Sequence, residues 1–204
     1  MFHEGDKMKK KIAITGGIGS GKSLILSILK KEGFACFSCD AIYDELIEDV
    51  AYIEKVKIAF PGVVFDGVID RKRLSAIVFS NESQRLKLNA LAHTSIMNKL
   101  HEKMDKEKGN LVFAEVPLLF EGDYQNQFDG VIVVVRDKEE RIQSVQNRDG
   151  LTREEVLRRM NAQFDYQSFF DSDKKNEEHI YFIKNNGTIE QLEKEVTAIV
   201  KHFS

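Results

Sequence analysis

The chain has 204 residues, of which 42% are hydrophobic and 31% charged, a composition typical of one globular domain with a sizeable core. The formal net charge of −3 argues against nonspecific binding to nucleic acid. No apolar run approaches the ~20 residues of a membrane-spanning helix, and residues 1–8 lack the apolar stretch of a signal peptide. We therefore expect a cytoplasmic protein without nucleic-acid or membrane partners.

A glycine-rich loop follows the first predicted strand, which is the apolar run at residues 12–14. The loop reads Gly16-x-x-x-x-Gly21-Lys22-Ser23, and apolar residues recur after it at helical spacing until Gly33, a suitable C-terminal cap. This order of strand, loop and helix is the context in which the motif binds phosphate. We therefore predict a nucleoside triphosphate site made by Gly16, Gly17, Ile18, Gly19, Ser20, Gly21, Lys22, Ser23 and Leu24.

The residue types in this loop suit that chemistry. Glycines let the backbone curve so that successive N–H groups point at phosphate oxygens, and the helix N-terminus adds roughly half a positive charge. The Lys22 ammonium can reach the β- and γ-phosphates, and the Ser23 hydroxyl can hold Mg²⁺. The alternative, a chance glycine-rich turn, does not explain why motif and context agree.

The second predicted strand, residues 34–38, is followed by Cys39 and Asp40. Cys36 and Cys39 form a C-x-x-C pair, which occurs in redox sites and in zinc sites. Residues three apart on a strand face opposite ways, and the histidines show no ligand spacing that would complete a zinc site. We interpret both cysteines as incidental.

A long insertion separates the second strand from the third, because more than seventy residues lie between them. One crossover helix requires far fewer. We predict an inserted helical subdomain over residues 41–108, broken around Pro61-Gly62 and Asp66-Gly67. Its longest helix, from about residue 81 to residue 106, carries one apolar stripe of Leu86, Ala90, His93, Met97, Leu100 and Met104. On this stripe His93 is more typical of a core residue than of a ligand.

The third predicted strand, residues 111–116, contains Glu115 near its end. Ligands of an open parallel sheet bind beyond the carboxyl ends of its strands. We therefore expect Asp40, at the end of the second strand, and Glu115 to project toward the triphosphate. There a carboxylate can hold Mg²⁺ or accept the proton of the attacking hydroxyl. The alternative for Asp40 is an N-cap of a helix starting at Ala41.

Six arginines follow the fourth predicted strand, residues 131–135: Arg136, Arg141, Arg148, Arg153, Arg158 and Arg159. Guanidinium groups can clamp the charge of a transferring phosphoryl group. Arg141 and Arg148 share a helix face, and residues 138–170 are predicted to form a helical lid that excludes water. The alternative is that each arginine lies on the surface of an amphipathic helix.

Capping boxes at Thr152-x-x-Glu155 and Thr188-x-x-Gln191 predict the starts of two late helices. Between them lies the fifth predicted strand, residues 180–184. The final helix carries an apolar stripe of Ile189, Leu192, Val196, Ile199 and Phe203. Continuous apolar strands joined by helices predict an α/β fold with a parallel five-stranded sheet flanked by helices.

With these motifs in place, the sequence resembles the dephospho-CoA kinase family over nearly its whole length. The matching motifs are Thr15–Ser23, Cys39-Asp40-Ala-Ile, Gly67-Val-Ile-Asp-Arg71 with Leu74 and Phe79, Leu91-Ala-His93, Pro117-Leu-Leu-Phe-Glu121, Arg148-Asp-Gly-Leu-Thr152, Gln163 and Asn185-Asn-Gly187. The loop alone is shared by many P-loop proteins, whereas the ordered set is specific.

The resemblance implies a P-loop kinase-like fold and ATP-dependent phosphorylation of the ribose 3′-hydroxyl of dephospho-CoA, with Mg²⁺. It implies that the insertion binds the pantetheine-bearing substrate. It identifies Lys22, Asp40 and Arg148 as catalytic, with Asp40 as the base or the hydroxyl-orienting group. It adds Arg141 and Asn185 to the nucleotide site. It assigns to the substrate side Asp40, Asp70, Arg71, His93, Pro117 and Leu118.

The sequence departs from the family pattern at three positions, where Ser38 replaces an aspartate, Thr94 a proline and Ser144 an arginine. Loop and catalytic candidates are all present, so we expect activity. One alternative is another P-loop kinase that acts on a nucleoside monophosphate or a small hydroxy acid. A second is a nucleotide-dependent switch, but a GTPase would need an Asn-Lys-x-Asp motif, which does not occur. We expect a monomer or a weak homo-oligomer.

Overall fold

The structure, a computed structural model, describes residues 9–172 and 179–203. The chain divides into two compact units. The first comprises Met1–Cys36 and Lys106–Ser204, and the second is Phe37–Asp105. No helix in the described ranges is both long enough and apolar enough to cross a membrane.

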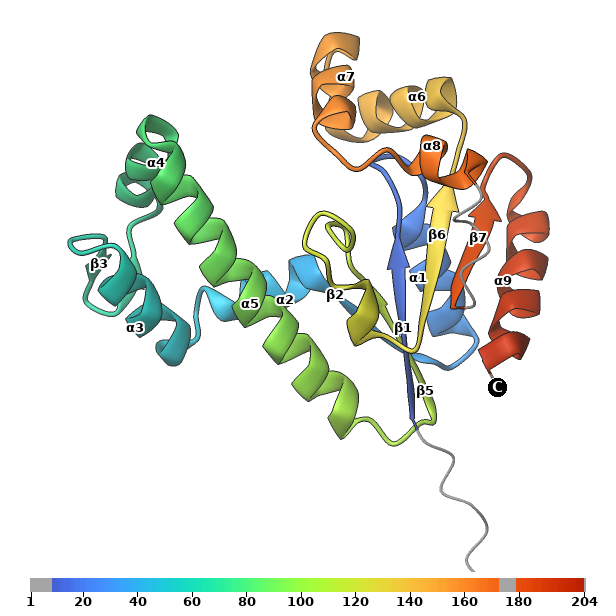
Figure 1. The fold of residues 1–204 in the computed structure, drawn as a ribbon, viewed down its shortest axis with the longest axis horizontal. Coiled ribbons are helices and arrows are strands. Elements are labelled where there is room, and N and C mark those ends of the chain that lie inside the picture. The colour runs from blue at the N-terminus through green and yellow to red at the C-terminus, as the bar shows by residue number, and fades with distance from the viewer. Residues whose placement is uncertain (1–8, 173–178, 204) are drawn as a thin grey trace, which may run out of the picture. The chain divides into compact units, whose positions relative to one another are not determined.

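A five-stranded sheet forms the centre of the first unit, with the strand order β2-β5-β1-β6-β7 (Figure 1). Its strands are β1 (Lys10–Thr15), β2 (Ala35–Ser38), β5 (Leu111–Glu115), β6 (Gly130–Val135) and β7 (Ile180–Lys184). The central strand β1 pairs in parallel with β5 and β6, and β6 pairs in parallel with β7. All five predicted strands are confirmed. The inner strands β1, β5 and β6 are buried along most of their length, as continuous apolar runs predict for a parallel sheet, whereas the edge strands β2 and β7 are only partly buried.

The helices of this unit are α1 (Lys22–Lys31), α6 (Lys138–Asp149), α7 (Arg153–Asn161), α8 (Tyr166–Asp171) and α9 (Ile189–Phe203), with a 3₁₀ turn at Gln125–Gln127. Helices α1 and α9 pack on one face of the sheet around a shared apolar core, and both lie beside the strands in Figure 1. Helices α6 and α7 bury a small core of their own, formed by Ile142, Val145 and Val156. The parallel α/β architecture predicted from the sequence is therefore confirmed.

Several predicted helix ends are also confirmed. Gly33 follows α1 with a φ of +92°, and the N–H of Phe34 returns to the Leu29 carbonyl, as in a glycine-terminated helix. Thr152 and Glu155 form a complete capping box at the start of α7. The second box is present too: the Thr188 N–H donates to the Gln191 side chain, and the Gln191 N–H donates to the Thr188 hydroxyl.

The apolar stripe predicted for α9 is wrong at its first residue. Ile189 is 57% exposed, whereas Val200, outside the predicted stripe, is buried with Val196 and Phe203. Ile189 is the first residue of the helix, so it lies at the end of the helix rather than over the sheet. The remaining helix covers the sheet as expected.

The second unit contains α2 (Cys39–Leu46), α3 (Val50–Ala59), β3 (Val64–Phe65), β4 (Val68–Ile69), α4 (Arg71–Ser80) and α5 (Glu82–Lys106). Strands β3 and β4 form a short antiparallel hairpin, where the sequence predicted only a break between helices. Asp66 and Gly67 form its turn with φ angles of +46° and +77°. Such Asp-Gly turns favour hairpins, but strands of two residues are too short to give an alternating pattern.

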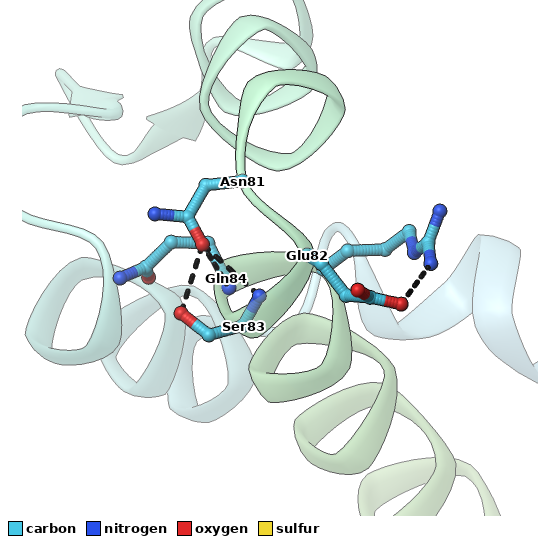
Figure 2. Close-up of polar contacts among 5 residues, drawn as sticks. Asn81, Glu82, Ser83 and Gln84 are labelled. Atoms are coloured by element: carbon cyan, nitrogen blue, oxygen red, sulfur yellow. Dashed lines mark hydrogen bonds and ion pairs between the residues drawn. The ribbon is translucent and has the colours of Figure 1, made fainter.

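Asn81 forms the junction between α4 and α5, and Figure 2 shows its side chain at the start of α5. Its Oδ1 accepts hydrogen bonds from the Ser83 N–H and hydroxyl and from the Gln84 N–H, as an N-cap does. An ion pair between Glu82 and Arg85 adds to the first turn. The predicted long helix is therefore confirmed.

The apolar stripe predicted for α5 is only half correct. Met97, Leu100 and Met104 are buried. Leu86, by contrast, is 59% exposed. In the first part of the helix it is Leu88, not the predicted stripe residue Leu86, that faces other residues and lines a pocket.

Candidate active site

The glycine-rich loop has a backbone that only glycine adopts without strain. Gly16, Gly19 and Gly21 have φ angles of +145°, +77° and +101°. A Cβ on Gly16 would also collide with the Val134 carbonyl of β6, and one on Gly17 would overlap the Arg141 guanidinium. The sequence motif therefore reflects a tightly curved loop pressed against β6 and α6.

Helix α1 begins at Lys22 with an N-terminus suited to an anion. Its N-cap, Gly21, makes no side-chain cap, and its first turn contains no acidic residue. The N-terminal N–H groups of a helix lack intrahelical partners and carry positive potential. The Lys22 ammonium lies over the loop, donating to the Gly16 carbonyl at 2.8 Å and to the Gly17 carbonyl at 3.3 Å. The Lys22 ammonium and the N-terminus of α1 thus meet at the same loop.

Ser23 and Glu115 meet beside the loop, as expected from the parallel register that pairs Ile14 with Glu115. The Ser23 hydroxyl lies 3.2 Å from Oε1 and 3.1 Å from Oε2 of Glu115. Glu115 is 8% exposed, so its carboxylate is held in a largely dry position at the end of β5. The expectation that Glu115 projects toward the glycine-rich loop is confirmed.

This pair of oxygen ligands fits a magnesium ion. Mg²⁺ prefers oxygen ligands and commonly takes only one or two from the protein, with phosphate and water supplying the rest. The described residues contain no cluster of three or more His, Cys, Asp or Glu side chains that could form an all-protein metal site. Both cysteines are free thiols.

Helix α6 brings two of the predicted arginines to this region. The Arg141 Nε donates to the Ile18 carbonyl at 2.9 Å, and burial lowers the pKa of its guanidinium. Arg148 is close enough to Glu115 for the two charges to interact. Asp149 holds Arg148 by two bonds, from Nε to Oδ1 at 2.7 Å and from Nη2 to Oδ2 at 2.9 Å, which raises the pKa of Arg148.

The other arginines largely follow the surface alternative. Arg136 pairs with Glu140, and Arg153 binds Glu139 through two hydrogen bonds of 2.7 Å. Arg159 lies 4.0 Å from Asp149. Arg136 and Arg153 therefore follow the surface alternative, because neighbouring glutamates on α6 engage them.

Three side chains from later in the chain also hold the loop. The Asn185 amide donates to the Ser20 carbonyl at 2.8 Å. Gln163 accepts a hydrogen bond from the Ile18 N–H at 2.8 Å. The Tyr166 hydroxyl lies 3.0 Å from the Thr15 hydroxyl. Asn185 was predicted for this site, whereas Gln163 entered only as part of the family pattern.

Tyr166 is a residue of this region that the sequence did not reveal. It is 3% exposed, and burial raises the pKa of its phenol far above the usual range, so the hydroxyl remains a donor. It donates to the Pro117 carbonyl at 3.3 Å. Pro117 thus contacts α8 through its backbone, while the predicted substrate residue Leu118 is 38% exposed. One tyrosine in a short helix gives no periodic signal that would have identified it.

Asp40 differs from its predicted position. Strand β2 ends at Ser38 and α2 begins at Cys39, so Asp40 is the second residue of the helix rather than the end of the strand. The N-cap is Ser38, and the interpretation of Asp40 as a cap is therefore wrong. Asp40 is exposed and, within the described ranges, its carboxylate has no hydrogen-bond partner.

The remaining predicted substrate residues also lie in the second unit. Asp70 is the N-cap of α4, accepting from the Lys72 and Arg73 N–H groups, so its carboxylate already has a structural task. Arg71 is exposed. His93 is half-buried, and burial lowers the pKa of its imidazole, which is therefore neutral at pH 7.

A curved loop between β1 and α1 of a parallel sheet, with a lysine over it and a serine and glutamate beside it, defines the P-loop kinase class. The fold agrees: shikimate kinase from Acinetobacter baumannii is similar with a TM-score of 0.53 at 14% identity, covering 96% of this chain and 95% of that one. At that identity the likeness concerns the fold alone.

The comparisons give the family. The dephospho-CoA kinase profile matches residues 10–191. Dephospho-CoA kinase of Thermus thermophilus is 34% identical over 95% of this chain and 91% of its own. That of Deinococcus radiodurans is 32% identical over 95% and 92%. The crystal structure of TT1252 from Thermus thermophilus has a TM-score of 0.79 at 33% identity, covering 97% of this chain and 100% of that one. The chain belongs to the dephospho-CoA kinase family.

Proposed function

We propose that this protein transfers the γ-phosphoryl group of ATP to the ribose 3′-hydroxyl of dephospho-CoA, giving coenzyme A and ADP. The observation that carries the proposal is the uncapped N-terminus of α1, with Lys22 above it and the Ser23–Glu115 pair beside it. Family membership supplies the acceptor.

The loop residues bind and orient ATP. Backbone N–H groups of the loop and of the first turn of α1 receive the phosphate oxygens, and Lys22 exchanges its loop carbonyls for the β- and γ-phosphates. Arg141, Gln163 and Asn185 keep the loop in this shape through their hydrogen bonds to it. Positioned charges of this kind supply most of the catalysis in phosphoryl transfer.

Mg²⁺ would be held by the Ser23 hydroxyl, with Glu115 close enough to bind it directly or through water. When bound, the ion neutralises phosphate charge and orients the γ-phosphate. Ser23 would then turn its hydroxyl oxygen toward the ion, while Glu115 accepts the hydroxyl proton, as it does in this structure.

The acceptor oxygen attacks the γ-phosphorus as the bond to the β–γ bridging oxygen breaks and ADP leaves. We assign to the Asp40 carboxylate the proton released by the 3′-hydroxyl. Arg148 would stabilise the charge on the transferring group, which requires its guanidinium to exchange Asp149 for phosphate oxygens. Arg71, His93 and Leu118 would contact the substrate. Asp70 and Pro117 would act indirectly, by holding the backbone near the substrate in place.

Helices α6 and α7 serve as the lid in this proposal. Their small core, against which Ile18 of the loop also packs, joins the two helices, and residues 138–170 contribute the Arg141 and Gln163 contacts to the loop. Closure over the nucleotide would exclude water and so limit ATP hydrolysis.

The acceptor is tested by a coupled assay that measures ADP release with three additions: dephospho-CoA, a nucleoside monophosphate, or no acceptor. We expect rapid turnover only with dephospho-CoA. Preferred turnover with the monophosphate would favour another P-loop kinase. Equal ADP release without an acceptor would favour a nucleotide-dependent switch.

Replacing Ser23 by alanine is expected to weaken Mg²⁺-dependent turnover by about tenfold or more, because the hydroxyl's proposed partner is the ion. Binding of metal-free ATP, measured by calorimetry, should change little. Ser27→Ala is the matched control, since Ser27 lies one turn further along α1 and its hydroxyl, within the described part of the chain, bonds only to the Leu24 carbonyl. Equal losses of metal-free binding and turnover would contradict the metal role of Ser23.

A further inference from the structure

One buried side chain joins segments of the first unit that are far apart in the sequence. Tyr166, the first residue of α8, is 3% exposed, and its hydroxyl lies 3.0 Å from the Thr15 hydroxyl at the end of β1. The same hydroxyl lies 3.3 Å from the Pro117 carbonyl, two residues beyond the end of β5. Thr15 directly precedes the glycine-rich loop, and Pro117 directly precedes Leu118, which the proposed function places against the acceptor. Tyr166 therefore bonds to both the nucleotide side and the acceptor side of the site.

The directions of these hydrogen bonds follow from the donors that are present. A carbonyl oxygen can only accept, so the phenol proton goes to Pro117 and the Thr15 hydroxyl donates to the Tyr166 oxygen. The pKa of the phenol agrees with this assignment: burial raises it, whereas the hydrogen bonds from Thr15 and from the Gly16 backbone lower it, as donors to the oxygen do. The Tyr166 oxygen thus receives bonds from the start of the loop and passes one on to the acceptor side.

Aromatic packing holds the Tyr166 ring in place. Its centroid lies 5.2 Å from that of Phe164, edge to face, and 6.0 Å from that of Phe120. Phe120 and Phe164 stack on each other at 4.8 Å, and Phe169 packs against both. Aromatic pairs of this kind stabilise a structure beyond the area that they bury. The ring is therefore held by its neighbours independently of its hydroxyl, and the hydroxyl is kept at one point.

The chain just before this tyrosine is bound to the same two parts of the molecule. The Gln163 side chain accepts from the Ile18 N–H of the loop at 2.8 Å. The Phe164 N–H donates to the Glu121 carboxylate at 2.9 Å, and Glu121 belongs to the connection between β5 and β6. Residues 163–166 therefore bridge the glycine-rich loop and this connection at the point where the chain passes from α7 to α8.

Phosphoryl transfer is sensitive to the distance between these parts. The reacting atoms must approach to about 3–3.5 Å, and a displacement of about 1 Å can lower the rate on the order of 10²-fold. A residue that fixes the loop relative to the acceptor segment can thus affect the rate without touching either substrate. We propose that Tyr166 is a positioning residue, whose hydroxyl holds the glycine-rich loop and the Pro117–Leu118 segment at the spacing that transfer requires. The inference rests on the proposed function for the identity of the acceptor.

The first test replaces Tyr166 by phenylalanine, which removes the hydroxyl and keeps the ring in its aromatic packing. We expect kcat to fall by about tenfold to 10²-fold, while the Kd of ATP, measured by calorimetry, stays unchanged and Tm falls by only a few degrees. Tyr181→Phe is the matched control, because that ring packs on His202 and Phe203. It should keep wild-type kcat. A lower Tm with unchanged kcat in Tyr166→Phe would leave the residue a purely structural role and overturn the proposal.

Thr15 allows a double-mutant cycle. Thr15→Val removes the partner hydroxyl and should lower kcat, whereas Thr15→Ser keeps the hydroxyl and should retain most of the activity. The double variant Thr15→Val/Tyr166→Phe should lose no more than Tyr166→Phe alone, because effects that act through one shared bond are not additive. Losses that multiply in the double variant would show two independent effects and overturn the proposed link.

Amide hydrogen exchange tests the link without turnover. In Tyr166→Phe we expect the N–H groups of residues 15–18 and 118–122 to exchange faster than in the wild type. Tyr181→Phe should leave both segments unchanged. Wild-type exchange in both segments of Tyr166→Phe would overturn the proposal. If the wild-type protein did not phosphorylate dephospho-CoA, the proposed function would be contradicted instead, and the exchange rates would still decide whether Tyr166 joins the two segments.

Discussion

Replacing Lys22 by alanine is expected to lower kcat by at least about 10²-fold while the protein stays folded. Removing one preorganised charge-stabilising donor typically costs on the order of 10²–10³ in rate, and Lys22 is the residue whose charge can follow the γ-phosphate. Folding should be maintained, because alanine is a good helix former and Lys22 lies outside the apolar core. The measurements are kcat with ATP and dephospho-CoA, and Tm.

Lys30→Ala is the matched control for this variant. Lys30 lies on the same helix but in its last turn, where it is exposed. The Lys30→Ala variant should therefore retain wild-type turnover. Normal kcat in Lys22→Ala would contradict the assignment of residues 16–24 as the phosphate loop, even though the fold is that of P-loop kinases.

Replacing Asp40 by asparagine is expected to lower kcat by about 10²–10⁴-fold, the range of general-base catalysis. Asparagine has the same shape but cannot take the proton of the ribose hydroxyl. The KM for ATP should change little, because the residues assigned to ATP lie in the other unit. Tm should also stay close to the wild-type value, since Ser38 and not Asp40 is the N-cap of α2.

Asp44→Asn is the control for Asp40, because Asp44 is an exposed carboxylate one turn later on α2. Its neutralisation should leave kcat unchanged. If Asp40→Asn also kept near-native kcat, Asp40 would not be the base. Glu115, the other carboxylate predicted for this site, would then be the next candidate.

The fold was predictable where the sequence carries strong local signals. The five apolar strand runs, the glycine after α1 and both capping boxes all correspond to elements of the structure. The hairpin of β3 and β4 was not predicted, because two-residue strands leave no alternation to detect. The exposure of Leu86 was missed because periodicity locates a helix face but not the neighbours that cover it.

Part of the candidate site was also predictable from strong local signals in the sequence. The loop motif and the parallel sheet together predicted that Glu115 would project toward the loop, and in the structure it lies beside Ser23. Tyr166 could not be identified from the sequence, since it is a single aromatic residue whose hydroxyl matters only through its tertiary neighbours. The start of α2 was misplaced by two residues, enough to change Asp40 from a strand end to a helical position.

The central claim is most directly tested by locating the phosphate on the product formed from ATP and dephospho-CoA. Phosphorus NMR of the purified product distinguishes a phosphate ester on the ribose 3′-oxygen from esters elsewhere. We predict one ADP per new 3′-phosphate, with no transfer by Lys22→Ala. A phosphate on another oxygen of the acceptor, or ADP formed with free inorganic phosphate alone, would contradict the proposed function.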